Sequence, residues 1–124
     1  MSPLLESISN WESILNPVAE VQRRQLLGYL HALSSVKTAC APDLAVLVFG
    51  SIAKGSCRPW SDIDLAIVSD RFSGMPWFKR VALLKANQSL FSLISPLGLT
   101  YGEYASYNYP AVIRFIRDNH IRLL

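Results

Sequence analysis

Short apolar runs predict the strands of a small sheet. Residues 44–49 and 63–68 are rich in branched apolar side chains and bounded by turn-forming residues, which is typical of buried β-strands. Residues 94–100 predict a third strand, and Pro96 within this run favours a position at the edge of the sheet. The closing residues 120–124 predict a short extended segment.

Apolar residues at intervals of three and four predict the helices. Residues 1–16 show this spacing, and Asn16-Pro17 ends it, so a second helix is predicted from Pro17 to about residue 36. The first helix is the less strongly indicated of the two and is also a candidate surface for a partner or a second copy of the chain. Further helices are predicted over 76–93, 101–107 and 110–119.

The same spacing assigns side chains to the inner and outer faces of these helices. In the 76–93 helix, we expect basic residues, including Arg80, to face solvent. The residues expected to be buried are Trp77, Val81, Leu84, Leu90 and Phe91 in that helix, and Val112, Ile113 and Ile116 in the 110–119 helix. Before the 101–107 helix, Thr100 and Glu103 have the spacing of a capping box.

These elements predict an α/β (α+β) fold with a small mixed sheet of three to five strands backed by helices. A chain of 124 residues, 51% of them hydrophobic, is expected to form a single domain over its whole length. The formal charge of +3 suits a protein that handles anionic phosphates. Because the basic residues are scattered, we do not expect a nucleic-acid partner.

The two cysteines, Cys40 and Cys57, lack the spacing of a zinc site, and the first residues lack the pattern of a secretory leader. No apolar run reaches the roughly 20 residues that cross a bilayer. We therefore expect a cytoplasmic protein with reduced thiols and no membrane partner.

Two aspartates at the start of the second strand are the main candidates for chemistry. Side chains alternate along a strand, so Asp62 and Asp64 are expected on one side, with Ile63 in the core. Two like charges in this arrangement favour a divalent cation, although a pair of merely solvated aspartates is the alternative. Gly50-Ser51 follows the first strand directly, where a glycine allows a sharp turn and free N–H groups at a helix start attract phosphate. By itself, this dipeptide would indicate only an ordinary helix cap.

The combination of Gly50-Ser51, Ala53-Lys54-Gly55 and Ser61-Asp62-Ile63-Asp64-Leu65 resembles the signature of the DNA polymerase β-type nucleotidyltransferase superfamily, most closely its minimal nucleotidyltransferases. The resemblance implies the polymerase β-like nucleotidyltransferase fold and a site for two Mg²⁺ ions at the aspartates. It also implies that Gly50 and Ser51 hold the triphosphate. Lys54 either reaches this phosphate or lies in solvent, and Ser61 is expected to orient Asp62 by hydrogen bonding.

The family's third carboxylate is expected near residues 94–97, where this chain has Ser95 and Pro96. Glu103 is the nearest candidate for the missing group, so the candidate catalytic residues are Asp62, Asp64 and Glu103. The capping box explains Glu103 without any catalytic role, and both interpretations stay open. Trp60 offers a similar choice between stacking on a base and packing.

Two functions follow from the resemblance. The first is transfer of a nucleoside monophosphate, with AMP from ATP as the first candidate, to a hydroxyl of a protein or small molecule. Minimal members of the superfamily often act with a separate helical protein of the HEPN kind in toxin–antitoxin pairs, which makes such a protein a candidate partner. The second is a nucleotide-binding or protein-interaction module of the same fold whose catalytic power is weakened by the missing carboxylate.

Overall fold

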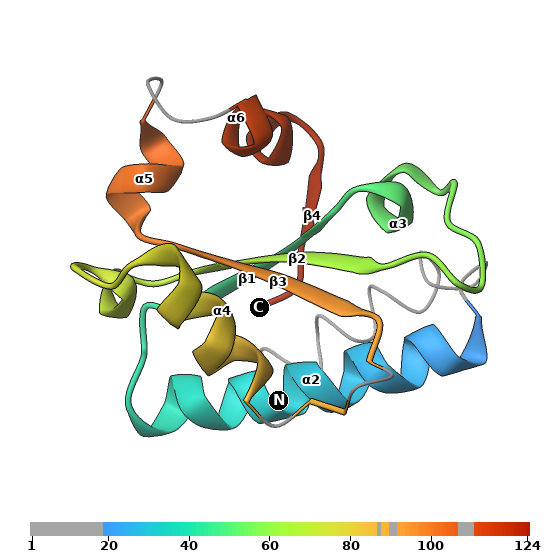
Figure 1. The fold of residues 1–124 in the computed structure, drawn as a ribbon, viewed down its shortest axis with the longest axis horizontal. Helices are drawn as coiled ribbons and strands as arrows, with labels where there is room; N and C mark the ends of the chain where they lie inside the picture. Colours follow the sequence, from blue (N-terminus) through green and yellow to red (C-terminus); the bar gives the residue numbers. More distant parts are fainter. Residues whose placement is uncertain (1–18, 87, 90–91, 107–110) are drawn as a thin grey trace.

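The structure is a computed structural model that describes residues 19–86, 88–89, 92–106 and 111–124. A sheet of four strands lies at its centre, in the order β3-β2-β1-β4. Helices cover both faces of this sheet (Figure 1). In chain order the elements are α2 (Glu20–Ala39), β1 (Ala45–Phe49), α3 (Ser51–Lys54), β2 (Ile63–Val68), the 3₁₀-helix η1 (Asp70–Phe72), α4 (Trp77–Lys85), β3 (Ile94–Leu99), α5 (Tyr101–Ala105), α6 (Ala111–Asp118) and β4 (His120–Arg122).

The sheet is mixed, as the sequence predicted. β1 pairs antiparallel with both β2 and β4, whereas β2 pairs parallel with β3. β3, which contains Pro96, lies at one edge, in agreement with the limit that a proline places on central strands. The parallel pairing of β2 and β3 requires a long crossover, and α4 lies in that connection.

Alternation along the strands divides the core into two layers. One layer joins the sheet to α2, where Leu26 and Leu30 pack with side chains such as Leu65. The other joins the sheet to α6, through Ile113 and Ile116. Figure 1 shows α2 along one face of the sheet, with α5 and α6 on the opposite face.

The strands and helix types of the described regions agree with the sequence, but several boundaries differ. α2 begins at Glu20 and continues to Ala39, past the predicted end at residue 36. α4 ends at Lys85, well before the predicted residue 93, so β3 is reached through an irregular segment. The 1–16 helix lies outside the described residues, as do Leu90 and Phe91.

The prediction for the faces of α4 was wrong at Trp77 and Arg80, whereas Leu84 packs against the core as predicted. Trp77 is 42% exposed, whereas Arg80, which was expected in solvent, is only 4% exposed. Arg80 donates hydrogen bonds to the carbonyls of Met75 and Gly98 and forms an ion pair with Glu103. A periodicity argument treats arginine as polar and cannot anticipate a buried partner. In α6, Val112 is likewise exposed, whereas Ile113 and Ile116 are buried as predicted.

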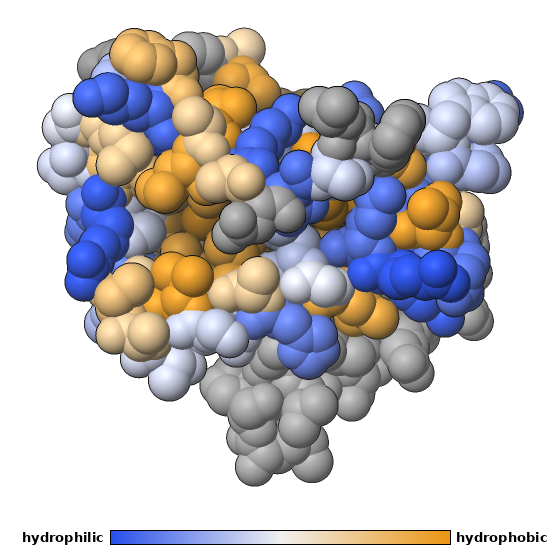
Figure 2. All heavy atoms as spheres, turned by 60° about the horizontal axis from the view of Figure 1, so that its bottom comes forward, coloured by the Kyte–Doolittle hydropathy of each residue, from blue (hydrophilic) through white to orange (hydrophobic). Residues whose placement is uncertain are grey.

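The surface on the α2 side is uneven in polarity. Figure 2 shows more hydrophobic side chains toward the α4 end of this face and more hydrophilic ones toward the α3 end. Phe78 and Leu83 on α4 are 71% and 59% exposed. Within the described part of the chain, no helix is long and apolar enough to cross a membrane.

Candidate functional site

One row of side chains crosses the sheet beside the Gly50-Ser51 turn. The register pairs Asp64 with Phe49 on one side and with Ser95 on the other, and Phe49 pairs in turn with His120. Residues paired across neighbouring strands share a face, so these four side chains lie on the face covered by α5 and α6. The row places the start of β2 next to the end of β1, where the chain turns at Gly50.

The backbone of Gly50 lies directly beside the side chain of Asp64. Its φ of 74° is in the left-handed region that favours glycine, as the sequence predicted for this turn. A Cβ atom added at Gly50 would collide with Oδ2 of Asp64. The absence of a side chain therefore allows the backbone of this turn to approach the carboxylate directly.

The two aspartates repel each other, and no cationic side chain of the described residues forms an ion pair with either of them. Ile63 is fully buried between them in sequence, while Asp62 is exposed and Asp64 half-buried. Burial, and secondarily the charge of Asp62, raise the pKa of Asp64 above its ordinary value. Among the described residues, no side chain or backbone donor forms a hydrogen bond or ion pair with the Asp64 carboxylate.

Two adjacent carboxylates without donors fit a divalent cation, because Mg²⁺ prefers hard oxygen ligands and its charge would remove their repulsion. Asp62 and Asp64 would hold such an ion. Within the described ranges, no cluster of three or more His, Cys, Asp or Glu side chains could hold a metal. Among the described residues, the ligand set at this point thus consists of two carboxylates.

Sequence reasoning missed Gln22, which fixes the turn that leads into Asp62. Its side chain is fully buried, and its amide nitrogen donates to the carbonyls of Arg58 and Ser61, at 2.8 and 2.9 Å. Its amide oxygen accepts from the backbone of Ala19, at 3.2 Å. All the hydrogen-bonding groups of this amide are therefore engaged in holding the turn against α2. A glutamine on the inner face of an amphipathic helix was the signal that could have found it.

Ser61 acts on the turn that leads into Asp62. Its hydroxyl accepts a hydrogen bond from the backbone N–H of Arg58 at 2.8 Å, and its own N–H donates to the Arg58 carbonyl at 2.9 Å. No hydrogen bond joins Ser61 to Asp62 among the described residues, so a direct effect of Ser61 on Asp62 stays a prediction. Ser61 shapes the backbone from which Asp62 extends.

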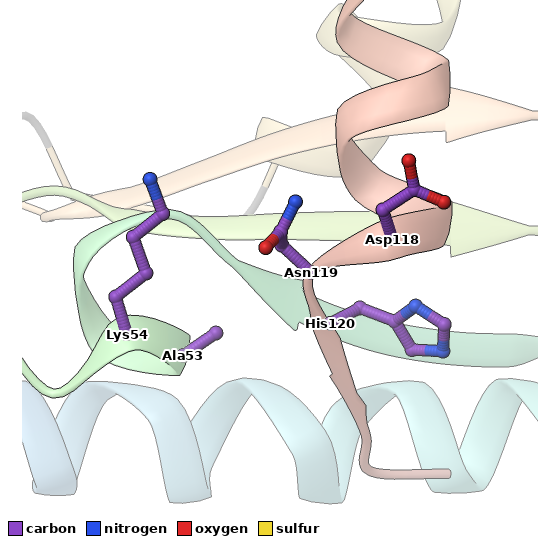
Figure 3. Close-up of a pocket in the computed structure, with 5 residues that line it drawn as sticks. All are labelled: Ala53, Lys54, Asp118, Asn119 and His120. Carbon is purple, nitrogen blue, oxygen red and sulfur yellow. The ribbon is translucent and has the colours of Figure 1, made fainter.

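Ser51 and Lys54 belong to the short helix α3, which starts directly after Gly50. The ammonium group of Lys54 lies 4.5 Å from the centre of the Phe115 ring on α6. Lys54 and Ala53 line a cavity of about 260 Å³ together with the last residues of α6 and the start of β4. Figure 3 shows the side chains of Lys54 and Asn119 extending in the same direction beside this cavity, with the His120 ring pointing away from α3.

Glu103 is not brought to this site. β2 and β3 are parallel, and Ser95 pairs with Asp64, whereas Glu103 follows the far end of β3. At about 3.3 Å per residue, Ser95 and Leu99 are roughly 13 Å apart along the strand, and Glu103 lies beyond Leu99. Figure 1 shows α3 and α5 at opposite ends of the sheet. The prediction of Glu103 as the third carboxylate is therefore not supported by its position.

The roles that Glu103 does fill are structural. Its side chain pairs with Arg80 and accepts a hydrogen bond from the backbone of Thr100 at 2.8 Å, while the Thr100 hydroxyl accepts from the Glu103 N–H. This is the predicted capping box. At the site itself, the residue in register with Asp64 on β3 is Ser95.

The chain is similar to known proteins over most of its length. Residues 29–119 match the family model of the nucleotidyltransferase domain. A crystal structure of a proposed nucleotidyltransferase from Sulfolobus solfataricus is similar in fold, with a TM-score of 0.57, 23% sequence identity, and coverage of 83% of this chain and 82% of the other. No curated protein matches the sequence.

Proposed function

We propose that this chain, which belongs to the nucleotidyltransferase domain family, transfers a nucleoside monophosphate from a nucleoside triphosphate to a hydroxyl group. AMP from ATP is the first candidate, and the acceptor is a protein or a small molecule. The observation that carries this proposal is the position of Asp64. Its carboxylate is half-buried, lacks any donor among the described residues, and lies beside the backbone of Gly50.

In this proposal, Asp62 and Asp64 hold Mg²⁺, with two ions as the family resemblance implies. Bound metal of this kind offsets negative charge on phosphoryl oxygens. Gly50 leaves room for a phosphate beside the turn, and the Ser51 hydroxyl adds a donor there. Lys54 offers a cation on the same short helix, at the edge of the cavity beside α6.

The acceptor and its protein context are further proposals. A helical protein of the HEPN kind, as in a toxin–antitoxin pair, is one candidate that could present the acceptor hydroxyl, and a second copy of the chain is another. A cytoplasmic location remains our expectation from the sequence. In support of reduced thiols, Cys40 and Cys57 are both free.

A catalytically weakened nucleotide-binding module is the second candidate, and one observation favours it. Ser95 stands in register with Asp64, at the place where a carboxylate on β3 would approach the aspartate pair. With two carboxylates instead of three, a metal would be held more weakly and an acceptor hydroxyl would lack a nearby base.

Incubation with α-labelled ATP and Mg²⁺ in cell lysate tests the choice between these functions. We expect label on a protein or small molecule, lost in Asp64→Asn and retained in Asp70→Asn, a matched variant just beyond the opposite end of β2. Absence of label, together with Mg²⁺-dependent ATP binding, would favour the binding module. If the protein neither transfers label nor binds Mg²⁺ and ATP, both functions are wrong.

A further inference from the structure

The turn before β2 presents an aromatic side chain to solvent. Trp60 is 71% exposed, although a tryptophan normally buries most of its large apolar surface. The sequence left open whether this indole packs or stacks on a ligand. Its exposure excludes packing in the core, so another reason is needed for an indole at this position.

The backbone that carries Trp60 is fixed. The buried amide of Gln22 holds the carbonyls on both sides of the turn, at Arg58 and Ser61, and Ser61 closes the turn through its own hydrogen bonds to Arg58. An exposed side chain on such a backbone loses less freedom when a ligand binds than one on a loose loop. The turn therefore presents the indole in a preorganised position.

A second residue of the turn defines the chemistry of this surface. The guanidinium of Arg58 lies 6.0 Å from the centre of the Trp60 ring, within the range of a cation–π contact. An indole exposed to this extent, beside a guanidinium, suits a flat aromatic ring that can stack on the indole and whose nitrogen or oxygen atoms accept hydrogen bonds from arginine. A nucleobase has both properties.

The position of the turn connects this surface to the aspartates. Trp60 precedes Asp62 by two residues, so their Cα atoms are separated by at most about 7 Å. A nucleotide whose phosphates lie at Asp62 and Asp64 has its base within reach of the indole. We propose that Trp60, with Arg58 beside it, is the stacking surface for the base of the bound nucleotide. This inference rests on the proposed function, because it takes the phosphate position from there.

Binding measurements with and without a base test the inference. The dissociation constants of ATP and of inorganic tripolyphosphate, both with Mg²⁺, are compared by calorimetry for the wild type, Trp60→Ala, Trp60→Phe and Phe78→Ala. Loss of one base–aromatic stack should weaken ATP binding about tenfold in Trp60→Ala and less in Trp60→Phe. Tripolyphosphate binding should not change. Phe78, also 71% exposed but on α4, is the matched control and should leave both constants unchanged.

The outcomes separate this inference from the function on which it rests. Unchanged ATP binding in Trp60→Ala, or an equal loss for ATP and tripolyphosphate, would overturn the stacking role while leaving the metal and phosphate site in place. The same holds if Trp60→Ala impairs transfer but not ATP binding, because the indole would then contact the acceptor. If the wild type binds neither ligand with Mg²⁺, the phosphate site itself is wrong and the inference fails with it.

Discussion

Carboxylates at the two ends of the sheet have opposite surroundings and opposite pKa shifts. At the end near α3, Asp64 is half-buried, has Asp62 as its charged neighbour, and has a raised pKa. At the end near α5, the half-buried carboxylates of Asp43 and Glu103 are surrounded by donors, and both pKa values are lowered. Within the part of the chain that the structure describes, the same type of group thus has no donor at one end of β2 and several donors at the other.

Each partnered carboxylate has a definite set of donors. Asp43 accepts from the backbone N–H of Asp70 and from the Ser69 hydroxyl, both at 2.7 Å, and the first of these contacts does most to lower its pKa. Burial alone would raise the pKa of Glu103, but hydrogen bonds from Arg80 and from the Thr100 backbone lower it overall. Figure 1 shows that β3 leads directly into α5 at this end of the sheet.

The difference separates carboxylates that stabilise the fold from those available to a ligand. A fold that supplies donors to Asp43 and Glu103 can satisfy half-buried carboxylates where structure requires it. Among the described residues it supplies none to Asp64, which lies against a turn that favours glycine, and this difference supports the proposed cation site. The comparison can be tested by removing each kind of group in turn.

The largest effect on stability is expected from Glu103→Ala. The side chain of Arg80 is only 5% exposed, so loss of Glu103 leaves a buried charge without its anionic partner, with the carbonyls of Met75 and Gly98 as its remaining acceptors. We expect the free energy of unfolding to fall by about 3 kcal/mol, the lower end of the range for a broken buried pair. Chemical denaturation at neutral pH measures this change. Below the unfolding transition, Mg²⁺-dependent ATP binding should stay within about twofold of wild type. A specific loss of the metal dependence would instead indicate that Glu103 takes part in metal binding.

Gln22→Met should destabilise the fold less but should also affect the site. The substitution keeps the side-chain volume but removes the donor to the carbonyls of Arg58 and Ser61 and the acceptor for the N–H of Ala19. The Arg58 carbonyl still accepts from the Ser61 N–H. We expect a loss of about 2 kcal/mol in the free energy of unfolding, within the range for unsatisfied buried groups. The Mg²⁺ concentration needed for half-maximal ATP binding should rise, because Asp62 extends from this turn. An unchanged requirement in a folded variant would show that the turn does not position the aspartate.

Much of the fold could be predicted from local patterns. The apolar runs at 44–49 and 63–68 correspond to β1 and β2, and the capping box placed the start of α5 correctly. Predictions failed where a contact with a distant part of the chain determines whether a side chain is buried. Arg80 is buried because Glu103 and two carbonyls from other segments meet it, and no periodicity along α4 contains that information.

The same distinction between local patterns and distant contacts applies to the residues of the site. Gly50 and the two aspartates could be identified from the sequence because spacing along one strand and the need for a positive φ are local properties. The position of Glu103 away from the aspartates could not be predicted from the sequence, because it depends on the parallel pairing of β2 and β3. This pairing places Ser95, and not Glu103, beside Asp64. Gln22 was missed because its partners are 36 and 39 positions away in the chain.

Ser95→Asp adds a carboxylate at the end of the sheet near α3, beside Asp64. This variant tests whether a third carboxylate there strengthens metal binding. Ser95 and Asp64 share a register position and a face, so an aspartate at 95 would extend beside the pair. We expect the apparent affinity for Mg²⁺ to rise about tenfold, the lower end of what a supporting group contributes to a metal site. Ser95→Asn, which adds the same bulk without the charge, is the control. Equal effects of the two variants would contradict a role for a third carboxylate at this position.

The smallest expected effect is a pH dependence of opposite sign at the two ends, measured without metal. The folded pKa of Glu103 lies below its ordinary value of 4.5, so its ionised form stabilises the fold above that pH and this contribution disappears as the pH falls through the folded pKa. The folded pKa of Asp64 lies above its ordinary value of 3.8, so ionisation destabilises the fold at neutral pH and not below pH 3.8. Relative to wild type at neutral pH, Glu103→Gln should therefore lower the melting temperature, and Asp64→Asn should raise it. Both differences should shrink toward acid pH, as followed by thermal unfolding in EDTA. If Asp64→Asn instead destabilises the fold at neutral pH, then Asp64 has a stabilising partner and the two ends of the sheet are alike.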